Sequence, residues 1–172
     1  MTSKLILFLV APEFEDLEFW VPLMRMQEEG HQVIVAGKKA KEVYTGKQGL
    51  IAVSDMTFDN INPDEFDAVV VPGGWAPDKL RRYDCVKHIV RTMYEQNKIV
   101  GLICHAGLVG ISAGIVEAGY PAVGSEGIKD DLINAGAIWT DKAAFRSKNI
   151  VWGRVIADIP SFCRELVEAL KD

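Results

Sequence analysis

The chain has 172 residues, a length that suits one domain of ordinary size. Hydrophobic residues make up 49% of it and charged residues 25%, so it can bury a full core and is not of the disordered class. Its 19 Lys and Arg against 24 Asp and Glu give a net charge of −5, which argues against nucleic acid as the main partner because phosphate binding needs concentrated positive charge. We therefore expect one domain over residues 1–172.

The first predicted element is a strand over residues 5–10, an uninterrupted apolar run typical of a strand that is buried on both faces. The run continues only to Pro12, so it is too short to cross a bilayer. Acidic residues follow it where a secretory signal would have a small-residue cleavage site. We expect neither a membrane span nor a membrane partner.

A helix is predicted next, because apolar residues recur at the spacing of one helical face. The residues expected to face the core are Leu17, Trp20, Val21 and Met24. Pro22 lies inside this pattern and should kink the helix. Gly30 suits the position just past the helix end, where a positive φ is common.

The rest of the chain alternates between strands and helices. Residues 33–36, 67–71 and 99–103 are short apolar runs typical of buried strands, and the glycine-containing residues 38–59 predict a hairpin. Helical spacing returns at Val86, Ile89, Val90 and Met93, and again at Ile159, Phe162, Cys163, Leu166 and Leu170. This alternation predicts a three-layer, flavodoxin-like α/β sandwich with a mostly parallel sheet and helices on both faces.

In such sheets, ligands bind beyond the carboxyl ends of the strands. Cys104 directly follows the strand at 99–103, and Ala106 and Gly107 leave room for the sharp turn of a nucleophile elbow. The start of the following helix would favour the thiolate form of the sulfur. The alternative is an inert cysteine at a buried strand end. The three cysteines form no CxxC pair, which favours a reducing cytoplasm over a disulfide scaffold.

Two further segments follow strand ends. Gly73 and Gly74 come after the strand at 67–71, where their N–H groups would point at an oxyanion, unless they serve only a tight turn. Residues 13–18 hold four acids, most of which would cap the helix or compensate its dipole. We expect one of these carboxyl groups to lie beside Cys104 and keep its proton, because two like charges there do not both ionise easily.

The remaining histidines and cysteines suggest less chemistry. Cys85 and His88 are three residues apart on one predicted helix and could pair as nucleophile and base, but a mid-helix pair lacks an oxyanion site. His31 is expected to be structural or exposed. Because the histidines lack the spacing of metal ligands, we expect no metal and no other cofactor.

Four motifs together resemble the ThiJ/PfpI family, most closely its PfpI-type intracellular proteases: EFED at 13–16, PGGWAP at 72–77, ICHAG at 103–107 and GIKDD at 127–131. The resemblance runs nearly end to end and implies a flavodoxin-like sandwich. It also implies that Cys104 is the nucleophile and that Glu15 is the protonated acid contacting its sulfur. His105 takes the position of the family's histidine, and the backbone N–H groups of Gly74 and His105 form the oxyanion site.

The sequence departs from the family pattern at two points. Asp78 stands where these proteases have a glutamate that a neighbouring subunit contributes to the triad. Ser125 and Glu126 replace an aromatic residue before GIKDD, so Glu126 would add a charge to the pocket. The resemblance also implies a homo-oligomer, either a dimer or a hexamer.

Three functions are compatible with these residues. The preferred one is a PfpI-like cysteine hydrolase acting on peptides, in which Cys104 attacks a carbonyl and His105 moves protons. The second is a glutathione-independent glyoxalase III or deglycase that acts on a small carbonyl substrate such as methylglyoxal, with Glu15 and His105 as acid and base. The third is a redox sensor or stress chaperone without catalysis, since an exposed thiolate oxidises readily.

Overall fold

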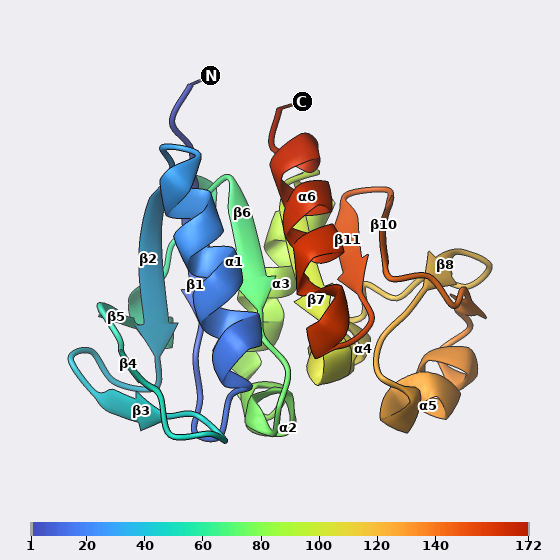
Figure 1. The fold of residues 1–172 in the computed structure, drawn as a ribbon, viewed down its shortest axis with the longest axis horizontal. Coiled ribbons are helices and arrows are strands. Elements are labelled where there is room, and N and C mark those ends of the chain that lie inside the picture. The colour runs from blue at the N-terminus through green and yellow to red at the C-terminus, as the bar shows by residue number, and fades with distance from the viewer. Residues whose placement is uncertain (1, 172) are drawn as a thin grey trace.

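A seven-stranded sheet forms the middle layer of the computed structural model, which describes residues 2–171 (Figure 1). The strand order is β10-β11-β7-β6-β1-β2-β5, and all neighbours are parallel except β10 and β11. The strands are β1 (Leu5–Leu9), β2 (Gln32–Gly37), β5 (Met56–Thr57), β6 (Ala68–Val71), β7 (Ile99–Ile103), β10 (Ala144–Ser147) and β11 (Ile150–Gly153). The central strands β6 and β7 are buried along their whole length, which explains their uninterrupted apolar sequences.

Helices cover both faces of this sheet. On one face, α1 (Asp16–Glu28) packs against β1 and β2, and α6 (Ile159–Ala169) packs against β7 and β11 (Figure 1). On the other face, α3 (Asp84–Glu95) and α4 (Gly107–Ala113) pack against β7. The short helices α2 (Ala76–Leu80) and α5 (Lys129–Asn134) lie beside α4. The predicted three-layer, flavodoxin-like sandwich is confirmed.

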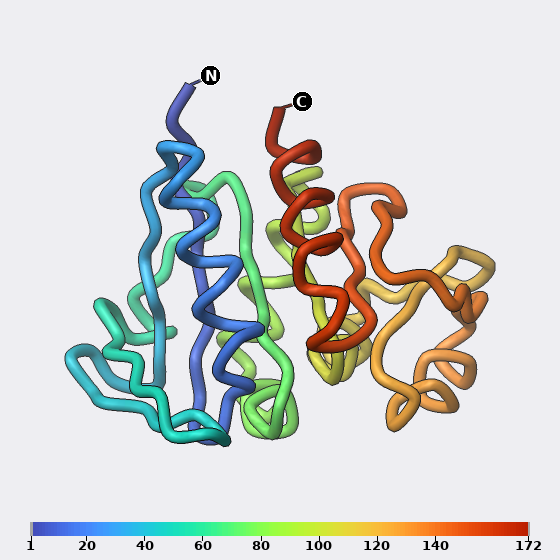
Figure 2. The backbone as a smooth tube through the Cα atoms, viewed as in Figure 1, coloured from blue at the N-terminus to red at the C-terminus, as the bar shows by residue number. Residues whose placement is uncertain are grey.

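Two small pairs of strands lie outside the main sheet. β3 (Val43–Thr45) and β4 (Ile51–Val53) are antiparallel, which confirms the hairpin predicted within residues 38–59. β8 (Pro121–Ala122) and β9 (Ile138–Trp139) form a short parallel pair. Figure 2 shows the β3–β4 connection running to the start of α1, at the edge where β1 ends.

The predicted inner face of α1 is wrong for three of its four residues, and only Trp20 packs against the core, half-buried. Leu17, Val21 and Met24 are 45%, 39% and 58% exposed, whereas Phe19 and Met26 on the other side of the helix are fully buried. Apolar residues occupy both sides of α1, so their spacing alone does not select the face that meets the core. The ring of Phe19 decides it by packing against the rings of Phe8 and Phe14.

The remaining helix predictions fit the structure better. Gly30 follows the end of α1 with a φ of 85°, as expected. α1 continues through Pro22, and the kink expected there stays a prediction. The residues predicted to face the core are buried in α3 and at α6, including Leu170 just after it. Within residues 2–171, no helix combines the length and the apolar character that a membrane crossing requires.

Candidate active site

Three strands end at the same edge of the sheet, and each is followed by a residue in the left-handed backbone region. Glu13 follows β1 with a φ of 62°, Gly74 follows β6 with 75°, and Cys104 follows β7 with 59°. Phe14 and Gly74 form an isolated β-bridge, and the Trp75 N–H donates to the Glu13 carbonyl at 2.9 Å. A strained conformation at a non-glycine residue costs about 1–3 kcal/mol and persists only where its surroundings hold it. The packed turns hold Cys104 in the geometry of an elbow.

The sulfur of Cys104 is surrounded by groups from two of these turns. The backbone N–H groups of Gly74 and His105 interact with it, and His105 Nδ1 lies 3.4 Å from Sγ. These are the two residues expected to supply the oxyanion site, and the structure brings both to the sulfur. Their part in a reaction stays a prediction.

The carboxyl group beside the sulfur belongs to Glu18, not to Glu15 as predicted. Glu15 is the N-cap of α1, and its Oε2 accepts the backbone N–H of Glu18 at 2.8 Å. Glu18 interacts with the Cys104 thiol, and its Oε2 accepts the N–H of Gly73 at 2.8 Å. The physical reason is local, because the free N–H groups at a helix start engage the carboxylate at the cap. Asp16 is buried too, but its carboxylate binds the β3–β4 connection, so the acid that reaches the sulfur is Glu18.

Gly73 lets Glu18 reach the sulfur. A Cβ atom at this position would overlap Oε2 of Glu18 and would lie 2.7 Å from the Cβ of Cys104. No side chain fits between these two groups. The first glycine of the pair is therefore needed for close approach, while Gly74 adopts the positive φ of the turn.

The Glu18 and Cys104 side chains hold protons more tightly than isolated groups do. Burial, followed by the charge of Glu15, raises the pKa of Glu18 to about 7. Burial, followed by the charge of Glu18, raises the pKa of Cys104 to about 12. Burial of the sulfur opposes the predicted resting thiolate, whereas the N–H groups of Gly74 and His105 favour it, so the thiolate stays a prediction. The pair shares a single negative charge near neutral pH.

One oxygen of this pair is left without a normal partner. Glu18 Oε1 is buried and has no hydrogen-bond partner within residues 2–171. Leaving a buried polar atom unsatisfied costs about 1–3 kcal/mol. A carboxyl oxygen in this position is well suited to accept a proton, which would remove part of that cost.

His105 is neutral at physiological pH. Burial lowers the pKa of its imidazole, the charge of Lys47 lowers it further, and the charge of Asp131 partly opposes the two. The ring packs beside Trp75, with 5.8 Å between the ring centres. A neutral imidazole can take up a proton, so His105 has the form of a general base.

Lys47 was not among the predicted site residues, although its charge acts on both Glu18 and His105. It lies in the β3–β4 connection, and its N–H donates to the Phe14 carbonyl at 2.9 Å. The buried Asp16 carboxylate anchors this connection by accepting the N–H groups of Gln48 at 2.8 Å and Leu50 at 2.7 Å. Asp16 and Gln48 are 32 residues apart in the sequence, so no local pattern predicts that this connection lies beside the start of α1.

The structure places two other predicted site residues away from the sulfur. Asp78 lies on α2 and forms an ion pair with Arg82 at 2.5 Å. Glu126 is exposed in a 3₁₀ turn, and it is the neighbouring Gly127 that faces the imidazole, where an added Cβ would lie 3.1 Å from Nε2 of His105. A role for Asp78 in a second subunit and a role for Glu126 in the pocket both stay predictions.

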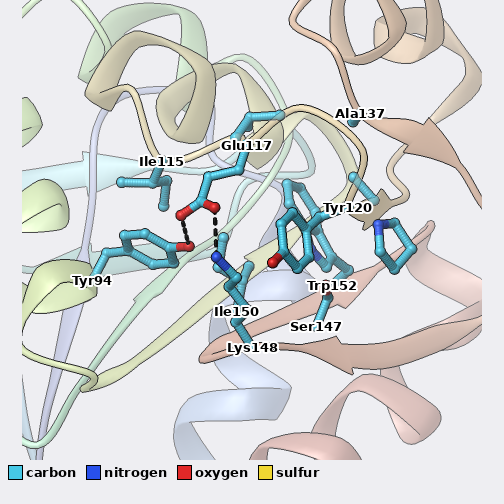
Figure 3. A pocket seen from close by; sticks show the side chains of 12 residues that line it. Tyr94, Ile115, Glu117, Tyr120, Ala137, Ser147, Lys148, Ile150 and Trp152 are labelled. Carbon is cyan, nitrogen blue, oxygen red and sulfur yellow. Dashed lines mark hydrogen bonds and ion pairs between the residues drawn. The ribbon is translucent and has the colours of Figure 1, made fainter.

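A second cluster of polar side chains surrounds Glu117 on another part of the molecule (Figure 3). The Glu117 carboxylate accepts hydrogen bonds from the Tyr94 hydroxyl and the Lys148 ammonium, each at 2.5 Å. Lys148 also lies 4.0 Å from the centre of the Tyr120 ring. The adjoining cavity measures only about 10 Å³, room for about one water. This cluster joins segments of the fold, and the cavity drawn in Figure 3 has no space for a substrate.

The chain is thus a flavodoxin-like α/β protein in which a strained cysteine after a central strand lies beside a buried carboxyl group. More specifically, the chain belongs to the DJ-1/PfpI family, whose sequence model matches residues 4–169. It is 45% identical to Deglycase PfpI of Pyrococcus furiosus over 96% of this chain and 99% of that protein. It is 36% identical to Protein/nucleic acid deglycase 2 of Escherichia coli, over 98% of each chain.

A solved structure gives the same answer for the fold. A two-domain protein of Anabaena variabilis, with DJ-1/ThiJ/PfpI-like and ferritin-like domains, matches with a TM-score of 0.95 and 35% identity. The match covers 98% of this chain and 48% of the other, so the present chain spans about half the length of that protein. The predicted ThiJ/PfpI membership is confirmed.

Proposed function

We propose that this protein is a cysteine-dependent enzyme that removes α-oxoaldehydes such as methylglyoxal, both as free aldehydes and as their adducts with amines. The observation that carries the proposal is the position of Cys104 Sγ, which interacts with the Glu18 carboxyl group and lies 3.4 Å from His105 Nδ1. The deglycase names of two relatives support this function over the peptidase that we preferred from sequence.

The first step forms a bond between the sulfur and the aldehyde carbon. As Cys104 attacks, its thiol proton passes to the Glu18 carboxylate, and the carbonyl oxygen accepts hydrogen bonds from the N–H groups of Gly74 and His105. That oxygen then takes the proton back from Glu18, which gives a hemithioacetal. With an amine adduct, the C–N bond breaks as the S–C bond forms, and the amine leaves with the proton. Both substrates thus converge on one intermediate.

The second step is an internal redox change that needs no outside oxidant. His105 removes the proton from the carbon that carries sulfur and returns it to the adjacent carbon. The first carbon becomes a thioester, and the neighbouring ketone becomes an alcohol. Water then cleaves the thioester, so that methylglyoxal yields lactate and Cys104 regains its thiol.

Peptide cleavage makes a greater demand on these residues. An amide nitrogen must be protonated by a well-aligned acid as it leaves. Asp78 is the residue expected to orient His105 for that task from a neighbouring subunit, and its carboxylate is already paired with Arg82. Addition to a free aldehyde has no leaving amine, and the amine of an adduct can leave with the proton that Glu18 takes from the thiol. Both reactions therefore need only the groups found at Cys104.

The test compares the natural protein with Cys104→Ala and with the matched control Cys85→Ala. Cys85 is a half-buried thiol on α3 whose pKa is raised by burial and by Asp59. Each protein is incubated with methylglyoxal, with its N-acetylarginine adduct and with denatured casein, and lactate is measured by NMR. We expect Cys104→Ala to reduce lactate formation by about 10³-fold or more, since the nucleophile is removed. Cys85→Ala should match the natural protein.

Two results would contradict the proposal. Equal lactate formation by the natural protein and Cys104→Ala would contradict it. If both rates equal the rate without protein, the non-catalytic functions remain, and selective peroxide oxidation of Cys104, detected by intact mass, would then favour a redox sensor. Casein cleavage that depends on Cys104, without lactate, would establish the peptidase instead.

We also propose that the protein is a homo-oligomer in which a second copy covers the outer side of α1 and the β3–β4 hairpin. Both elements carry exposed apolar side chains: Leu17, Val21 and Met24 on α1, and Val43, Ile51 and Val53 on the hairpin. The two elements adjoin because Asp16 binds the hairpin connection. Neighbouring exposed apolar side chains favour a protein interface.

Light scattering after size exclusion tests this interface. The natural protein should have at least twice the mass of one chain, and Met24→Asp combined with Ile51→Asp should lower it. Ile138→Asp is the control, since Ile138 is equally exposed on β9, away from this surface. A natural protein with the mass of one chain would exclude the oligomer.

A further inference from the structure

A cavity of about 550 Å³ opens at the carboxyl ends of β1 and β2, where open α/β sheets hold ligands. Neither Cys104 nor Glu18 nor His105 lines it. Its apolar lining includes residues 10–12 and the rings of Phe58 and Tyr83, whose centres lie 5.4 Å apart. The volume falls within the range of roughly 300–1,000 Å³ that small-molecule sites occupy.

The cations around this cavity differ in whether they already have a partner. Lys38, Lys79 and Arg82 line it with one carboxylate, that of Glu42. Lys79 pairs with Glu13 and Arg82 pairs with Asp78, both carboxylates outside the lining. Glu42 accepts the hydroxyl of Tyr44 at 2.5 Å. The ammonium group of Lys38 has no ion pair within residues 2–171, so it is the lining cation that is free to meet a ligand. An unpaired cation beside apolar rings favours an anion that carries an apolar group.

The side of the cavity formed by Tyr44 is held in place. Its ring is 4% exposed, and its hydroxyl accepts the N–H of Lys38 at 2.8 Å. Burial, followed by the hydrogen bond to Glu42, raises the pKa of Tyr44 to about 12, so the hydroxyl stays neutral. At Gly37, an added Cβ would lie 2.7 Å from ring atoms of Tyr44. The site is therefore formed before a ligand arrives, which limits the ordering cost of binding.

The cavity and the Cys104 site lie on either side of the turn at Glu13. The Glu13 carboxylate pairs with Lys79 of the cavity at 2.9 Å, whereas its backbone carbonyl accepts the N–H of Trp75, whose ring packs on His105. We propose that this cavity is a second binding site for small organic anions with an apolar ring. The ring would contact Phe58 and Tyr83, and the anionic group would meet Lys38 and Lys79. This inference goes beyond the proposed reaction and does not rest on Cys104.

Isothermal titration calorimetry with two probes of similar shape tests the site. The probes are 2-naphthoate, which is anionic, and 2-naphthamide, which is neutral. We expect naphthoate to bind about tenfold more tightly than naphthamide, because charge-assisted hydrogen bonds are roughly twice as strong as neutral ones. Lys38→Gln and Lys79→Gln should each weaken naphthoate about fivefold and leave naphthamide unchanged. Lys142→Gln, which changes an exposed lysine outside the cavity, is the control.

The titration is repeated on Cys104→Ala, which should bind naphthoate as the natural protein does even though it lacks turnover. Loss of binding in this variant would place the probe at the catalytic sulfur and overturn the inference. Equal affinity for the two probes, or an affinity that neither lysine variant changes, would also overturn it. Circular dichroism of each variant checks that the fold is intact.

Discussion

Glu18 and Glu117 are two glutamates in different regions of the molecule. Their surroundings raise the pKa of Glu18 and lower the pKa of Glu117. Glu18 is 1% exposed, has one unsatisfied oxygen, and has a pKa raised to about 7 by burial. Glu117 pairs with Lys148 and Tyr94, and these hydrogen bonds lower its pKa (Figure 3). A carboxyl group with complete partners joins elements of the fold. A buried one that lacks a partner is available to move a proton.

The largest expected effect separates these two carboxyl groups by their role in turnover. Glu18→Gln keeps the shape of the side chain but cannot accept the thiol proton, so kcat/KM for methylglyoxal should fall about 10²- to 10⁴-fold. The matched variant Glu117→Gln should retain turnover within about twofold, since surface substitutions away from the site have small effects. Steady-state lactate formation measures both. Similar losses in the two variants would remove the distinction between the regions.

The second prediction concerns stability as a function of pH. Because the pKa of Glu18 rises from 4.5 to about 7 on folding, its contribution to stability is fully present below pH 4.5 and is lost as the pH rises through 7. At roughly 1.4 kcal/mol per pKa unit, the loss is about 3 kcal/mol. Urea unfolding at pH 5 and pH 8 should show this loss in the natural protein but not in Glu18→Gln. Parallel pH dependence in the two proteins would contradict the raised pKa.

Glu117 should show the reverse sign in the same experiment. The pKa of its carboxyl group is lowered in the folded protein, so its contribution is present above the unfolded pKa and is lost as the pH falls. Glu117→Gln should therefore lose stability relative to the natural protein at neutral pH and approach it in acid. A deficit that is constant with pH would point to packing instead of charge.

The smallest expected effect is a shift in the pH profile of turnover. The reactive form is the singly ionised pair of Glu18 and Cys104, so kcat/KM should rise about tenfold per pH unit up to about pH 7 and then level off. The positive charge of Lys47 lowers the pKa of Glu18. Lys47→Gln should move the midpoint to higher pH, and Lys142→Gln should not. A midpoint moved to lower pH would contradict the assignment.

The local pattern of the sequence predicts most of the fold and the position of the strained cysteine. Apolar runs such as residues 99–103 identify strands because a strand covered on both faces excludes polar residues. Small residues after Cys104 indicate the elbow, because a sharp turn leaves room for little else. The helical faces of α3 and α6 follow from spacing, since only one side of each is strongly apolar.

Long-range packing decided which carboxyl group meets the sulfur and which face of α1 is buried. Four acids stand in residues 13–18, and the cap at Glu15 is a contact within α1. Only the docking of α1 on the sheet shows that Glu18 points at Cys104. The same docking exposes Leu17 and buries Phe19, although both are apolar. Burial, which sets the pKa values of Glu18 and Cys104, is a property of the assembled layers. The sequence by itself determined which chemical groups are present, and the tertiary structure determined which of them meet and which lose water.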